Sequence, residues 1–159
     1  MTMQQHYIID GYNVVHAIPS LKKTLLHDAH SARELLIHSV AQLTHTKKFR
    51  CTIVFDGVTP EPSAKQSAHA PVHVIYSSPL SADAKIKQMI EHSKNRSLLV
   101  IITSDREILN FAKACSCQTH TSNHFSNLLS GSSETVTEKS DAPLTKSQID
   151  EWLKIFGEK

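Results

Sequence analysis

Four aspartates of this chain stand just beyond short apolar runs. Three of them end a run or follow it within two residues, in "YIIDG", "TIVFDG" and "VIITSD", and the fourth opens the segment after "VHVIY". These acids are Asp10, Asp56, Asp105 and Asp83. Carboxylates that lie close together repel one another, and a hard divalent cation relieves that repulsion. Mg²⁺ or Mn²⁺ polarises a phosphoryl oxygen and activates a bound water, so the pattern points to phosphodiester hydrolysis.

The apolar runs alternate with helical patterns along the chain. We predict strands and helices over the following ranges: strands at 7–10, 51–55, 72–76, 98–103 and 117–121, and helices at 29–47, 82–93, 106–115 and 122–129. Strands without polar alternation are covered on both faces, which is typical of a parallel sheet between helices. We therefore expect an α/β fold, a three-layer α/β/α arrangement with a central, mainly parallel sheet.

In such a sheet the carboxyl ends of the strands meet at one edge, and ligands bind there. We therefore expect the four aspartates to share that edge. A plainer interpretation remains open for each of them, because an aspartate after a strand also completes a turn or caps the next helix. That alternative applies most directly to Asp83 and Asp105, which stand at expected helix starts.

The length of 159 residues predicts a single domain, spanning residues 1–159. A long loop is expected over 58–71, where proline and small polar residues recur. Residues 130–143 are polar without periodicity and are expected to form a linker. They lead to an amphipathic helix expected over 145–156, which would pack back on the domain.

The composition sets only broad limits on partners and compartment. There are 17 basic and 15 acidic side chains, a net charge of +2, which neither demands nor excludes a nucleic-acid partner. The three cysteines do not form a disulfide framework, which fits a reducing compartment. No stretch approaches the ~20 apolar residues of a membrane span. We expect a soluble cytoplasmic protein with no membrane association.

Four motifs in order, "DGYNVV", "VFDG", "SADAKI" and "ITSDREI", and the tail "LTKSQIDEWLKIFG" resemble the NYN domains, and within them the YacP-like family. The resemblance covers nearly the whole chain. It implies the PIN-like nuclease superfold, with a central parallel sheet and a metal-dependent acidic site. YacP-like proteins are bacterial and are taken to be endoribonucleases, some of which act on messenger RNA at the ribosome. The implied partners are thus RNA and, for some members, the ribosome.

Carried over by position, the resemblance implies a catalytic set that consists of Asp10, Asn13, Asp56, Asp83 and Asp105. The four aspartates would hold Mg²⁺ or Mn²⁺, and Asn13 would hold the attacking water or a phosphate oxygen, unless it is only a turn residue. One departure stands in the third motif. It often reads Ala-Asp-Asp, and here Ala84 replaces the second acid.

Three further residues are candidates for binding the substrate. Ser104 would donate to a phosphate or cap the next helix, with the cap favoured. Arg106 would bind a phosphate or pair with Asp105. Arg33, on the first long helix, would bind substrate or serve as a surface or ion-pair residue.

Alternatives to the nuclease interpretation remain. Ala84 suggests a catalytically weak RNA- or ribosome-binding module of the same fold. A small-molecule phosphohydrolase or nucleotide-binding domain is a further option, although no GxGxxG or GxxxxGK loop supports a dinucleotide or P-loop site. Zinc-ligand residue types also gather near the end of the chain, without the spacing of common structural sites: Cys115, Cys117, His120 and His124.

Overall fold

The structure is a computed structural model, and it describes residues 4–59 and 72–131. Most of the expected loop at 58–71, the polar segment beyond residue 131 and the expected helix at 145–156 lie outside these ranges, so those expectations stay predictions. In the described ranges, no helix is long and apolar enough to cross a membrane.

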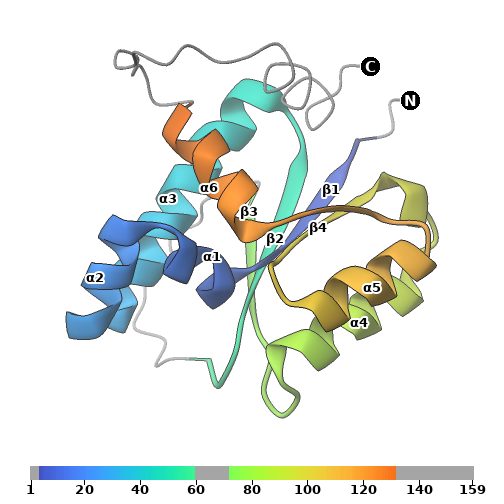
Figure 1. Ribbon diagram of the computed structural model, residues 1–159, viewed down its shortest axis with the longest axis horizontal. Coiled ribbons are helices and arrows are strands. Elements are labelled where there is room, and N and C mark those ends of the chain that lie inside the picture. The colour runs from blue at the N-terminus through green and yellow to red at the C-terminus, as the bar shows by residue number, and fades with distance from the viewer. Residues whose placement is uncertain (1–3, 60–71, 132–159) are drawn as a thin grey trace.

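A five-stranded sheet, parallel throughout, forms the middle of the molecule (Figure 1). Its spatial order is β3-β2-β1-β4-β5, so β1 is central. The strands are β1 (His6–Asp10), β2 (Arg50–Phe55), β3 (Val72–Tyr76), β4 (Leu99–Ile102) and β5 (Gln118–His120). This arrangement confirms the predicted α/β fold with a central parallel sheet.

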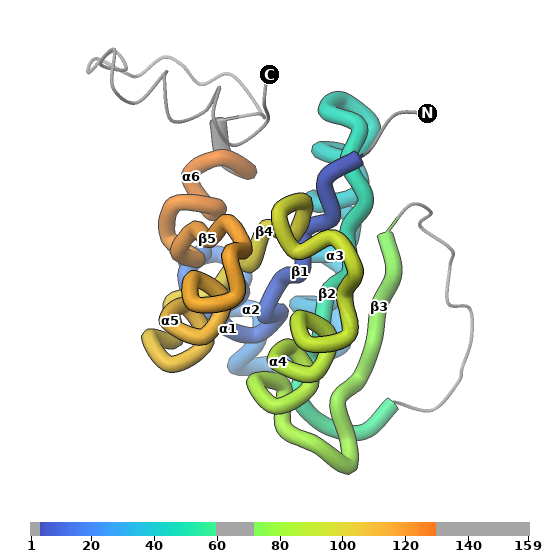
Figure 2. Tube along the Cα trace, turned by 90° about the vertical axis from the view of Figure 1, so that its right-hand side faces the viewer, coloured from blue at the N-terminus to red at the C-terminus, as the bar shows by residue number. Residues whose placement is uncertain are grey.

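Helices cover both faces of the sheet (Figures 1 and 2). One face carries α1 (Gly11–Ala17), α2 (Pro19–His27), α3 (Ala29–Lys47) and α6 (Ser122–Gly131). The other face carries α4 (Ala82–His92) and α5 (Arg106–Ala114). A single 3₁₀ turn, η1 (Arg96–Leu98), leads into β4.

The central strand shows why its sequence is an apolar run. Tyr7 and Ile9 point into the core beneath α1, α3 and α6, whereas Ile8 points into the core beneath α4 and α5. All three side chains are at most 1% exposed. Because successive residues of a strand face opposite sides, burial on both faces requires apolar residues at every position.

The junction between β1 and α1 has no loop. Asp10 ends the strand and Gly11 begins the helix. A Cβ atom on Gly11 would lie 2.5 Å from the Phe55 ring and 3.1 Å from the Ile53 side chain. The close approach of α1 to β2 therefore requires glycine at this position, and it fixes where the helix leaves the strand.

We predict that Gly11→Ala lowers the free energy of unfolding by about 1–2 kcal/mol, measured by urea denaturation. Overpacking against Phe55 costs more than the ~0.5–1 kcal/mol that alanine contributes in a helix. In a Phe55→Leu background the same change should cost less, because the ring that meets the new Cβ is gone. Higher stability of Gly11→Ala in the wild-type background would contradict this packing explanation.

Candidate active site

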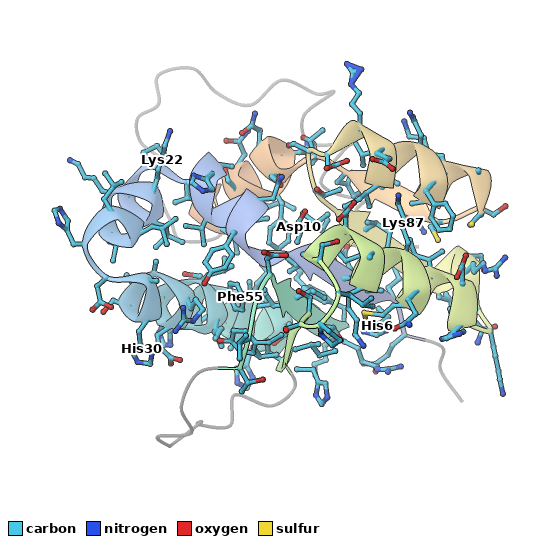
Figure 3. The ribbon with its side chains drawn as sticks, turned by 90° about the horizontal axis from the view of Figure 1, so that it is seen from below. His6, Asp10, Lys22, His30, Phe55 and Lys87 are labelled. Carbon is cyan, nitrogen blue, oxygen red and sulfur yellow. The ribbon has the colours of Figure 1, made fainter. Side chains whose placement is uncertain are left out.

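The four aspartates predicted from the sequence lie along the carboxyl edge of the sheet, which Figure 3 views from below with Asp10 near the centre. Asp10 ends the central strand, and Asp56 follows β2 directly. Asp105 stands at the start of α5, and Asp83 lies in the first turn of α4. In the β1–β2 ladder Asp10 pairs with Val54, two residues before Asp56.

Asp10 lies within the electric field of the other three acids. The pKa of its carboxyl is raised to about 6, mainly by burial, and a hydrogen bond from Thr103 opposes that rise. The negative charges of Asp105, Asp83 and Asp56 also contribute to the raised pKa, in that order of size. The other acids of the edge therefore favour the protonated form of Asp10.

Thr103, immediately after β4, joins the first and last acids of the edge. Its side chain is fully buried. Its hydroxyl donates to Oδ2 of Asp10 (2.9 Å) and accepts from the backbone N–H of Asp105 (3.0 Å). Sequence reasoning missed this residue, because it reads as the last member of an apolar strand. The available signal was a hydroxyl placed where the run "LVII" gives way to polar residues.

The other acids are held by nearby groups at helix starts. Asp56 accepts from the backbone N–H of Ala82 (2.9 Å), and Asp83 accepts from the hydroxyl of Ser81 (2.6 Å). Asp105 caps α5 by accepting from the N–H of Ile108 (3.1 Å).

The capping alternative is therefore correct for Asp105, and it does not apply to Asp10, whose side chain makes no cap to α1. For α4 the cap is Ser81, which accepts from the N–H of Ala84 (3.2 Å). Capping leaves the second carboxylate oxygen of Asp105 outside that bond, so it does not exclude a ligand role.

The donor set of the edge fits a hard divalent cation in its chemistry. All four side chains offer carboxylate oxygens, which suit Mg²⁺ or Mn²⁺. Within residues 4–59 and 72–131, none of them forms an ion pair with a lysine, arginine or histidine. In the same ranges no three His, Cys, Asp or Glu side chains are grouped closely enough to hold a metal ion. A metal site built from these side chains would therefore require them to shift.

That last observation also bears on the zinc alternative. Cys117 is buried, and His120 and His124 stack with their ring centroids 5.2 Å apart. The pKa of His120 is lowered to about 4, mainly by burial and in smaller part by the nearby His124. These residues form no group that could hold a metal among the described residues, so the structure does not support a zinc site here.

Asn13 connects neighbouring segments at the carboxyl edge through two hydrogen bonds to its side-chain oxygen. Oδ1 accepts from the backbone N–H of Ser104 (2.9 Å) and from the hydroxyl of Ser122 (2.5 Å). The N–H of Ser122 in turn donates to the hydroxyl oxygen of Ser104 (3.1 Å). The expectation that Ser104 caps α5 was wrong, because Asp105 takes that position. The Nδ2 amide of Asn13 has no hydrogen-bond partner within the described ranges, so it remains a donor.

The two candidate arginines lie on different elements. Arg106, the first residue of α5, is exposed and forms no ion pair with Asp105, or with any other acid of the described ranges. Arg33 of α3 donates from Nη1 to the hydroxyl of Tyr12 (3.0 Å) and lies 5.9 Å from the centroid of the Tyr76 ring.

Comparisons with known proteins agree with this architecture. The family model of the YacP-like NYN domain matches residues 7–154. The crystal structure of Rae1 (YacP) from Bacillus subtilis matches with a TM-score of 0.67 and 22% identity, over 80% of this chain and 74% of that one. Its W164L mutant matches with a TM-score of 0.64 and 20% identity, over 80% and 77%. No curated protein sequence matches the chain. At these identities the two structures support the fold alone.

We predict that Asp10→Asn stabilises the metal-free protein at pH 8. An acid whose pKa is raised on folding, here from 3.8 to about 6, contributes most below its unfolded pKa. That contribution is lost as the pH rises through 6. Asparagine removes the repelled charge and still accepts from Thr103, so we expect a gain on the order of 2–3 kcal/mol.

Thermal or urea unfolding in EDTA at pH 4 and pH 8 measures this difference. The stability gap between wild type and Asp10→Asn should open between these two pH values. A variant that is less stable than wild type at pH 8 would show that Asp10 serves as a turn or cap residue.

We predict that Thr103→Val raises the pKa of Asp10 above its wild-type value and lowers the unfolding free energy by about 1–3 kcal/mol. The substitution removes the donor to Asp10 and leaves the N–H of Asp105 without its acceptor. An NMR titration of the Asp10 carboxyl carbon follows the pKa. Thr103→Ser is the matched control, because it keeps the hydroxyl. An unchanged pKa in Thr103→Val would exclude the hydroxyl as the group that holds Asp10.

Proposed function

The chain belongs to the YacP-like NYN family, a family of PIN-like nucleases, and from that premise we propose that it is a metal-dependent endoribonuclease that hydrolyses phosphodiester bonds of RNA. The observation that most supports this proposal is the raised pKa of Asp10, which burial and three other acids raise, while no lysine, arginine or histidine of the described ranges forms an ion pair with its carboxylate. Family membership supports the finer proposal that the RNA is messenger RNA at the ribosome.

In this proposal Asp10, Asp56, Asp83 and Asp105 hold Mg²⁺ or Mn²⁺. When bound, the cation polarises the scissile phosphoryl group and lowers the pKa of the attacking water. The protein supplies the positions around it. Thr103 keeps the Asp10 carboxylate oriented toward the edge, and the cap at Ile108 fixes Asp105.

Neutral and cationic donors complete the proposed substrate site. The Nδ2 amide of Asn13 is available to donate to a phosphate oxygen or to the attacking water. The Ser104 hydroxyl is exposed beside it and has a proton to donate. Arg106 is exposed at the start of α5, where the helix dipole also favours an anion. Together these groups would orient the phosphate for in-line attack.

We predict that Asp105→Asn lowers RNA cleavage by at least about 10²-fold, since a weakened metal ligand costs several kcal/mol of transition-state stabilisation. The structure makes this a clean substitution, because asparagine is as good an N-cap as aspartate. Asp28→Asn is the matched control. Asp28 caps α3 by accepting from the N–H of Ser31 (3.2 Å), and it is an exposed residue away from the carboxyl edge.

The assay is cleavage of a mixed single-stranded RNA pool with manganese, beside EDTA and double-stranded DNA controls. Thermal melts of each variant accompany it. Equal cleavage by Asp105→Asn and wild type would refute the nuclease proposal. If Asp28→Asn lost as much activity as Asp105→Asn, a general effect of changing an N-cap residue would explain the loss.

A binding module with a weak site is the second candidate function. It is favoured by Ala84, which stands where the family motif often has a second acid, and by the lack of a finished metal group in the described ranges. The two candidates differ in what manganese does to the folded protein. A ligand that binds only the folded state stabilises it by RT ln(1 + [L]/Kd).

For the enzyme, we predict that manganese at ~100 times its Kd adds about 2.7 kcal/mol, or roughly 5–10 °C in Tm. The response should shrink in Asp10→Asn. Scanning calorimetry with EDTA and with manganese measures both proteins. Wild-type protein that binds RNA but shows neither cleavage nor a manganese response would favour the binding module. In that case Ala84→Asp is the variant that should restore a response.

A further inference from the structure

Arg33 is a partly buried cation without an acidic partner in the part of the chain that the structure describes. Its guanidinium is held by neutral groups. Nη1 donates to the phenol oxygen of Tyr12 at 3.0 Å, and Cζ lies 5.9 Å from the centroid of the Tyr76 ring. Partly buried charges in proteins are usually paired, so a fixed guanidinium that lacks a carboxylate is poised to bind an anion.

The aromatic side chains that support Arg33 stand beside the acidic edge. Tyr12 lies in the first turn of α1, two residues after Asp10. Tyr76 ends β3, next to Phe55 at the end of β2 in the ladder. The Phe55 ring lies 5.0 Å from Tyr12 and 5.7 Å from Tyr76, centroid to centroid. These rings therefore place Arg33 near the ends of β2 and β3, on one flank of Asp56.

The geometry also restricts what the site binds. Tyr76 contacts Phe55 and carries Arg33 above it, so its ring has little surface left for stacking a nucleobase. The guanidinium instead has five N–H donors in a planar fork, and the bond to Tyr12 uses one of them. Such a fork matches the paired oxygens of a phosphate. A phosphate therefore fits this site better than a base.

We propose that Arg33, held on Tyr76 and Tyr12, binds a non-scissile backbone phosphate of the RNA strand. This inference rests on the proposed function, since it names how the same edge holds its substrate. β3 lies two strands from β1, or about 10 Å at the usual strand spacing. The phosphate in question belongs to a linkage close to the one at Asp10. Tyr12 is a positioning residue in this arrangement, because its hydroxyl fixes the orientation of the fork.

The first test measures RNA binding without cleavage. Fluorescence anisotropy with a labelled single-stranded RNA of 12 nucleotides, in EDTA, gives Kd over a range of salt concentrations. We expect Arg33→Gln to weaken binding about tenfold and to reduce the slope of log K against log salt by about 0.7, the value of one phosphate contact on a single strand. Arg33→Lys should keep the slope and still lose affinity, because it keeps the charge and lacks the fork.

Arg96 provides the matched control. It is also an arginine bound to neutral acceptors, the backbone carbonyls of Ile90 and Glu91, and it precedes β4 at the opposite edge of the sheet. Arg96→Gln should leave both the affinity and the salt slope unchanged. Equal losses in Arg33→Gln and Arg96→Gln would overturn the proposal, since general basicity would then explain them.

The second test locates the phosphate. RNAs that carry one neutral methylphosphonate linkage, placed at each linkage in turn, remove one charge at a time. For wild type we expect one linkage at which affinity falls about tenfold, and in Arg33→Gln that linkage should have no further effect. Tyr12→Phe should weaken RNA binding, and the effect of the methylphosphonate should become smaller than in wild type at that same linkage only. Independent, additive losses at every linkage would overturn the proposal.

These measurements are separable from the nuclease proposal. A protein that binds RNA through Arg33 in this way but never cleaves it would support this inference and refute the enzyme. A protein that cleaves RNA with an unchanged salt slope in Arg33→Gln would do the reverse. Circular dichroism melts of the Arg33 variants show whether any loss of binding reflects loss of the fold. If Arg33→Gln unfolds, the folded Arg33→Lys protein provides the test, and an affinity equal to that of wild type would then overturn the site.

Discussion

The geometry of the carboxyl edge depends on the two hydrogen bonds that the Thr103 hydroxyl makes. Asp10 is partly buried and repelled by three other acids, so its carboxylate stays in place only where a donor holds it. Thr103 supplies that donor and uses its oxygen to fix the backbone at Asp105. A single buried group thus connects the end of β1, which carries Asp10, to the segment between β4 and α5, which carries Asp105. Because the side chain is fully buried, we expect that water cannot take its place.

A second set of contacts ties the helices to the same edge. Through its Oδ1, Asn13 holds both the segment before α5 and the start of α6, which lie 91 and 109 residues away in the sequence. The side-chain oxygen of Asn13 therefore serves the fold, and only its amide is left for chemistry. The same division applies to Asp105, whose one carboxylate oxygen caps α5. Each of these side chains thus has both a structural and a proposed chemical role. Only a substitution that preserves the structural hydrogen bond can therefore test the chemical role.

The sequence predicted what local patterns determine. The helix expected at 29–47 is α3, and the runs expected as strands are strands, because apolar spacing is a local property. The strand order could not be predicted from local patterns. Neither could the role of Thr103, because its partner Asp10 lies 93 residues away in the sequence. Gly11 shows the same limit. Asp-Gly is a turn signal in the sequence, yet the glycine begins a helix because Phe55 occupies the space of its Cβ. The predicted helix cap at Ser104 was wrong by one position, because the next residue, Asp105, caps α5.

The charge pattern of the edge links metal and RNA in the proposed enzyme. One phosphate 7 Å from one carboxylate is repelled by about 0.6 kcal/mol in water and by several times more near a protein surface. Four carboxylates multiply that repulsion beyond what a single arginine contact offsets. Lys87 offsets only part of it, because its ammonium is 2.8 Å from the carboxylate of Glu107 and interacts less strongly with Asp83 and Asp105. The scissile phosphate can therefore approach Asp10 closely only with a cation between them. Coupling between two ligands is reciprocal. The factor by which bound metal raises the affinity for RNA must therefore equal the factor by which bound RNA raises the affinity of the acids for metal.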